Sequence, residues 1–154
     1  MSQLTTPVLP PAHLVGGLPV NACSLLLTVN GAALALTGLV QSTFDLSGYF
    51  LNKGPLGPSL YGNPDTLAFV EAHGLAVIIG LLLIVHRNAA SVLWHRIAAA
   101  THVLLGTANL MFWAAFEQYD LVPMGIVATA MHMFFAATQT TAAALRNIDR
   151  GDRT

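Results

Sequence analysis

The sequence predicts an all-α integral membrane protein, an up-and-down bundle of four transmembrane helices. Hydrophobic residues make up 55% of its 154 residues and charged residues only 8%, whereas soluble domains contain about 25% charged residues. The apolar residues gather in four segments, each close to the length that spans a bilayer as a helix. None of these segments has the strand-period alternation of an outer-membrane barrel.

The four predicted helices are residues 20–43, 66–86, 92–116 and 121–145. The first carries Gly31, Ala35 and Gly38 at a spacing that lets helices approach closely in lipid. The second, TLAFVEAHGLAVIIGLLLIVH, is nearly unbroken and apolar, and it carries Glu71 and His73 in its first third. Ionisable groups at that depth are costly, so both should have partners in the bundle or on a cofactor.

Three regions complete the predicted domain organisation around a transmembrane domain of residues 20–146. Residues 1–19 form an irregular lead-in that contains several prolines, and residues 147–154 form a cytoplasmic tail. The glycines and prolines of residues 44–65 predict one long outer loop. The other two connections are short, which favours antiparallel neighbours in the bundle.

Basic residues set the predicted orientation. Five arginines lie beside the second connection or after the fourth helix, and only Lys53 lies in the outer loop. By the positive-inside rule both termini are cytoplasmic, and we expect a multi-pass protein of a bacterial inner membrane. The net charge of −1 excludes a basic surface for nucleic acid. The single Cys23 excludes an internal disulfide and a CxxC motif.

Three histidines lie inside the predicted helices: His73, His102 and His132. From the helical rise, His73 is about 10 Å below the outer boundary, His132 about 15 Å and His102 about 22 Å. A haem held edge-on between helices needs two neutral imidazoles at similar depth on different helices. His73 and His132 are therefore the favoured axial ligands of a haem b, with His102 as a replacement for either or as a supporting residue.

Small side chains beside these histidines leave room for a flat ring, and two phenylalanines are placed to wall it. The candidate cofactor-binding residues are His73, His132, His102, Phe69, Gly80, Ala128 and Phe135. Copper is a weaker alternative, because the methionines beside His132 point to other sides of the helix. The opposing interpretation is that the small residues serve helix packing and that each histidine bonds to a neighbouring helix.

His86 and His95 flank the predicted cytoplasmic turn, beside Arg87 and Arg96. We expect them to be solvated residues near the lipid head groups. The alternative for this pair is a small site for a quinone or a haem propionate near the inner surface.

Two stretches, FVEAHGLAVIIG and VPMGIVATAMHMFF, resemble one four-helix half of haem A synthase. The resemblance runs from about Leu67 to Thr141 and implies that His73 and His132 are the axial pair. The chain lacks the arginine that follows the ligand in that family and the family's cysteine-bearing outer loop, so its oxidative chemistry is not implied. A looser resemblance is to small, uncharacterised bacterial four-helix membrane proteins with intramembrane histidines, and it implies no activity.

The sequence thus predicts a small b-type haem-binding membrane protein for electron transfer or for haem sensing or handling. Two histidine ligands leave iron no open position, which favours electron transfer over an enzymatic role. Its expected partners are the lipid bilayer and a quinone or a redox protein. The alternative function is that of a cofactor-free subunit that stabilises or anchors a larger membrane complex or a homo-oligomer.

Overall fold

The computed structural model describes residues 14–15 and 18–151 of the chain, and the side chains of residues 22–146. Helices account for nearly all of this part, so the predicted all-α class is confirmed. The long helices are α1 (Val20–Leu51), α3 (Thr66–Val85), α4 (Val92–Met111) and α6 (Val122–Gly151). The short elements are β1 (Leu14–Val15), β2 (Leu18–Pro19), α2 (Gly57–Leu60), the 3-10 helix η1 (Arg87–Ala89) and α5 (Trp113–Gln118). Strands β1 and β2 form a minimal antiparallel pair.

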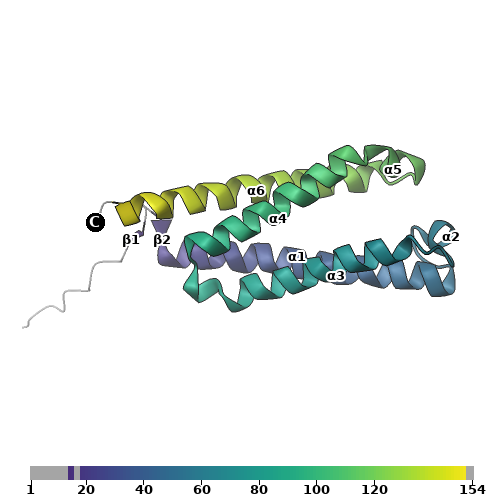
Figure 1. Ribbon diagram of the computed structural model, residues 1–154, viewed down its shortest axis with the longest axis horizontal. Coiled ribbons are helices and arrows are strands. Elements are labelled where there is room, and N and C mark those ends of the chain that lie inside the picture. Colours follow the sequence, from purple (N-terminus) through teal and green to yellow (C-terminus); the bar gives the residue numbers. More distant parts are fainter. Residues whose placement is uncertain (1–13, 16–17, 152–154) are drawn as a thin grey trace, which may run out of the picture.

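The long helices form two antiparallel hairpins that lie along one another (Figure 1). Helix α1 packs along α3 in the first hairpin, and α4 packs along α6 in the second. Contacts between the hairpins are sparser and come from α1, which touches both α4 and α6. The pair β1–β2 and the end of α6 lie at the same end of the molecule, because the four long helices run back and forth along it.

Glycines bring the backbones of α1 and α3 into direct contact. A Cβ atom on Gly31 would lie 2.5 Å from the carbonyl oxygen of Gly80, and one on Gly80 would lie 2.5 Å from that of Gly31. A Cβ atom on Gly38 would lie 2.6 Å from the carbonyl oxygen of His73. Any larger residue at these positions would push the helices apart. The close approach expected from the small residues of the first helix is therefore confirmed.

Helix α1 continues to Leu51, beyond the end expected at residue 43, so the outer connection is shorter than predicted and contains α2. The added residues contain no proline, and each residue joined to a formed helix gains a hydrogen bond. The helix stops where Asn52 takes a positive φ of 53° and Gly54 one of 93°. A left-handed residue just after the last turn is a common way for helices to end.

Two other boundaries differ from the prediction. The third predicted helix, 92–116, is divided, because α4 ends at Met111 and α5 begins at Trp113. Helix α6 continues to Gly151, through residues expected to form the tail. Residues 1–13 and 16–17 of the predicted lead-in, and 152–154 of the tail, lie outside the described residues.

Polar as well as apolar side chains are buried, and many large apolar side chains are exposed. The buried polar side chains are Asn30, Asp45, Thr66, His95, His102, Thr129, His132 and Gln139. Large apolar side chains are exposed along all four long helices, as at Leu36, Leu75, Leu104 and Val127. Exposed apolar side chains in this number favour a lipid or protein environment over water.

Two helices within the described residues are long and apolar enough to cross a membrane. They are Ala22–Leu51 of α1 and Thr66–Val85 of α3. Helices α4 and α6 do not meet the same criterion of length and hydropathy. Membrane association is therefore supported for the first hairpin by composition alone.

Candidate functional site

His102 of α4 and His132 of α6 meet in the interior of the second hairpin. Their Nδ1 atoms lie 2.9 Å apart, and their ring centroids are 5.1 Å apart. The two residues are only 0% and 8% exposed. At this separation one Nδ1 must donate a hydrogen bond and the other must accept it, since two unprotonated or two protonated nitrogens would repel.

Asn30 of α1 connects this histidine pair to the first hairpin. Its Oδ1 lies 2.9 Å from Nε2 of His102. An amide oxygen only accepts, so Nε2 of His102 donates to it, and the Nδ1 of a neutral His102 carries no proton. His132 therefore donates from Nδ1 to Nδ1 of His102. The three residues form one directed chain of hydrogen bonds across three helices.

A second polar contact crosses the same hairpin closer to the chain termini. Nδ1 of His95 lies 2.6 Å from Oε1 of Gln139, and both side chains are fully buried. His95 and His102 are seven residues apart on α4, and His132 and Gln139 are seven apart on α6. Seven residues make about two helical turns, so both contacts lie on the face that each helix turns to the other.

Several buried polar atoms along these contacts have no hydrogen-bond partner within the described residues. They are Asn30 Nδ2, His95 Nε2, Thr129 Oγ1 and Gln139 Nε2. An unsatisfied buried polar group costs about 1–3 kcal/mol. These atoms therefore have hydrogen-bonding capacity for water molecules or for a polar group of another molecule.

Phe135 and Gly106 shape the space around the histidine pair. The ring of Phe135 stacks on His102, with the centroids 5.0 Å apart and an interplanar angle of 25°. A Cβ atom on Gly106 would lie 3.2 Å from Cβ of His132, so the small residue lets α6 approach α4 at this level. Of the predicted site residues, the structure thus brings together His102, His132 and Phe135.

Three of the other predicted site residues lie on α3, away from this pair. His73, on α3, contacts Asp45 of α1 rather than His132, so the two histidines favoured as an axial pair have different partners in different hairpins. Phe69 is 40% exposed and walls no buried site. Gly80 serves the backbone contact with Gly31 described above. Ala128 is half-buried on α6, one helical turn before His132.

An iron atom does not fit between His102 and His132 as they stand. Metal–nitrogen bonds of about 2.0–2.1 Å place two opposite ligand atoms about 4 Å apart, whereas these Nδ1 atoms are 2.9 Å apart. Within the part of the chain that the structure describes, no group of three or more His, Cys, Asp or Glu side chains is arranged to hold a metal ion. Haem binding stays a prediction, and it would require the two rings to turn away from each other.

A further, partly buried pair lies toward the other end of the molecule, in the first hairpin. Nδ1 of His73 lies 2.6 Å from Oδ2 of Asp45, with the side chains 26% and 5% exposed. The contact at Gly38 brings the backbone of His73 against α1. A helical side chain leans toward the N-terminus of its own helix, and in this antiparallel pair that direction leads from His73 toward Asp45.

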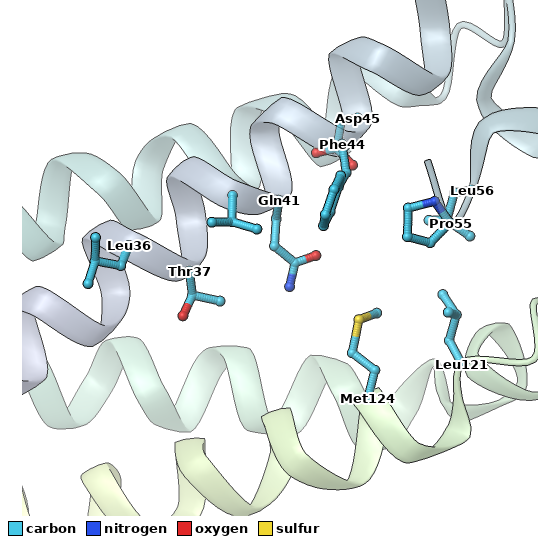
Figure 2. A pocket seen from close by; sticks show the side chains of 10 residues that line it. Leu36, Thr37, Gln41, Phe44, Asp45, Pro55, Leu56, Leu121 and Met124 are labelled. Atoms are coloured by element: carbon cyan, nitrogen blue, oxygen red, sulfur yellow. The ribbon is translucent and has the colours of Figure 1, made fainter. Parts of the chain in front are cut away.

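A cavity of about 330 Å³ opens beside Asp45, between α1 and the start of α6 (Figure 2). Its lining residues are Leu36, Thr37, Val40, Gln41, Phe44, Asp45, Pro55, Leu56, Leu121 and Met124. Figure 2 shows the amide of Gln41 and the thioether of Met124 extending into the space between the two helices. The walls are mainly apolar, and the polar groups all come from α1.

Two functional candidates were absent from the sequence prediction or wrong in it. Asp45 was expected in the outer loop, but it lies on α1 at the same seven-residue spacing as Gly31 and Gly38, the face that contacts α3. His95 was expected to be solvated; it is buried because its face of α4 packs on α6. In both cases the sequence held a signal: Asp45 is seven residues from Gly38, and His95 is seven residues from His102.

His86 was predicted to flank the same cytoplasmic turn as His95. It is half-buried, and its ring stacks on Trp94 at a centroid distance of 4.2 Å. His86 therefore lies apart from the histidine contacts described above.

Comparisons of the chain with protein-family models, with curated proteins and with solved structures found no match.

Proposed function

We propose that this protein spans the membrane four times and serves as a subunit that stabilises or anchors a larger membrane assembly. In this proposal its interior histidines hold its own helices together and ligate no haem. One observation carries it: the histidines of all three interhelical contacts bond through their ring nitrogens to side chains of neighbouring helices.

The faces of the second hairpin support the proposal of four spans. Helices α4 and α6 fall below the hydropathy criterion because their facing sides carry His95, His102, His132 and Gln139, which are buried against each other. Their outward sides are apolar, with exposed Leu93, Val103, Leu104 and Leu110 on α4 and Ile126, Val127, Met133 and Phe134 on α6. Polar residues that face the bundle interior and pair with one another are compatible with a membrane span.

The histidine contacts are those expected of a structural role. His95 and His102 join α4 to α6, His102 also joins α4 to α1, and His73 joins α3 to α1. Interhelical hydrogen bonds in membranes contribute about 0.6–2 kcal/mol each. Several of them in a short bundle account for the conspicuous histidines without a cofactor.

The small part of the chain outside the proposed bilayer region supports an assembly role. The histidines at the helix interfaces bond to neighbouring helices, and the connections between the long helices contain only short helical turns. Little of the described chain is left to act outside the bilayer. The outward apolar faces are available to lipid and to the transmembrane helices of a partner.

Haem carriage by His102 and His132 is a second candidate. It is favoured by two buried imidazoles from different helices at one level, with Phe135 stacked on one of them. This candidate needs both rings to turn so that iron enters between them. It would make the protein a membrane cytochrome of the electron-transfer kind.

One purification distinguishes these functions. The full chain is extracted in mild detergent from cells supplied with haem, and its visible spectrum, its native mass and its co-purifying proteins are measured. We expect no Soret band and a stoichiometric complex larger than the single chain. A Soret band near one haem per chain that is lost in His132→Ala and kept in His86→Ala would overturn the structural role, and a monodisperse single chain would overturn the assembly role.

A further inference from the structure

We infer that the cavity between α1 and the start of α6 binds the ring of a lipid-soluble quinol or quinone, with Asp45 and Gln41 as its hydrogen-bonding residues. This site shares no residue with the histidine contacts of the second hairpin. It goes beyond the proposed assembly role and rests only on the membrane location that the proposed function includes.

Asp45 is the group that sets this cavity apart from an ordinary gap between helices. Its side chain is 5% exposed and lines the cavity, while Oδ2 contacts Nδ1 of His73. A carboxylate accepts about four hydrogen bonds, so a single contact with His73 leaves it able to accept more. A buried carboxyl with free capacity at the wall of an apolar cavity is suited to a hydroxyl group brought by a ligand.

The polar side chains of the cavity form a line along one face of α1. Thr37, Gln41 and Asp45 follow one another at four-residue intervals, and each interval rises about 6 Å along the helix. This interval resembles the span between two oxygens at opposite positions of a six-membered ring. The amide of Gln41 can donate to one ring oxygen while Asp45 accepts from the other.

The remaining walls restrict the class of ligand. They are aliphatic, aromatic or thioether side chains, among them Val40, Phe44, Leu121 and Met124. Ions and strongly anionic head groups are disfavoured, because they would lose their hydration here and would lie beside Asp45. The volume of about 330 Å³ suits a single substituted ring, at the lower end of the range for small-molecule sites.

The ligand would arrive from the lipid and not from water. Leu36, at one end of the cavity, is 64% exposed and belongs to the outward apolar face of α1. An isoprenoid or alkyl tail could leave the cavity past this residue and lie along that face. A neutral ring with hydrogen-bonding oxygens and an apolar tail is the chemistry of membrane quinols.

The test measures saturable binding of decylubiquinol to the detergent-purified full chain, with 1-decanol as the probe for tail binding alone. We expect decylubiquinol to saturate one site and decanol not to compete. Gln41→Leu should weaken binding about five- to tenfold, the effect of one neutral hydrogen bond. Gln118→Leu, an exposed change on α5, should leave binding unchanged.

A second variant keeps the inference testable if Gln41→Leu folds poorly. Leu36→Trp adds a large side chain at an exposed position of the lining, so it should fold and block the site. Equal affinity of Leu36→Trp and the natural chain would overturn the inference. Competition by decanol at the same concentration would also overturn it, since the cavity would then hold only a tail.

Discussion

Nδ1 of His132 lies 2.9 Å from Nδ1 of His102, so the two most deeply placed candidate ligands are hydrogen-bonded to each other. Asn30 accepts from the far side of His102 and extends this contact to the first hairpin. An imidazole offers one donor and one acceptor in its neutral form, and this arrangement uses both on His102. The contribution of these hydrogen bonds and of the helix contacts around them to stability can be measured directly.

Replacing His132 with alanine should destabilise the protein by about 1–3 kcal/mol, because Nδ1 of His102 loses its donor in a buried place. The measurement is thermal unfolding in detergent, followed by near-ultraviolet circular dichroism. Met133→Ala, an exposed change on the same helix, is the matched control and should unfold close to the natural chain. Equal loss in the two variants would contradict the hydrogen-bonded role.

Asn30 and His102 should be energetically coupled across the two hairpins. Asn30→Leu removes the acceptor from a buried Nε2 donor and keeps the number of side-chain heavy atoms, and His102→Leu removes the donor. In a double-mutant cycle we expect a coupling of about 0.5–3 kcal/mol, as for residues in direct contact. Additive effects of the two changes would mean that the contact contributes nothing to holding the hairpins together.

Gly80→Ala should destabilise the first hairpin strongly, because its Cβ would lie 2.5 Å from the carbonyl oxygen of Gly31. Gly74→Ala lies on the same helix, where a Cβ meets nothing within 4 Å. In a helix interior that change should be neutral or stabilise by up to about 1 kcal/mol. The two variants are compared in one thermal melt, and similar midpoints would contradict the direct backbone contact of α1 with α3.

The proposed four spans predict that the two outer connections lie on one side of the membrane and the connection at η1 on the other. Cysteines introduced at Lys53 and Gln118 should both react with a membrane-impermeant maleimide from one side of intact vesicles, and a cysteine at Asn88 only from the opposite side. Cys23 is 1% exposed and should give little background. Labelling of Asn88→Cys and Gln118→Cys from the same side would show that the second hairpin does not cross.

Local sequence was sufficient for the helical class and for one helix contact. A long apolar segment has few alternatives to a helix when its backbone must satisfy its own hydrogen bonds. Gly31 and Gly38 predicted close approach because the absence of a side chain is a property of the residue itself. The interior location of His102 and His132 followed from their spacing within apolar segments.

The partners of the histidines were decided only by the tertiary structure. His73 was paired with His132 from predicted depth and from a family resemblance, but depth does not say which helices are neighbours or how each is rotated. Packing of α1 on α3 and of α4 on α6 gave these residues Asp45 and His102 instead. The position of Asp45 on a helix also depended on two further turns of α1, and local propensity did not distinguish those residues from a loop. A hydrogen bond between helices requires pairing, rotation and register together, and those are set by side-chain packing over the whole bundle.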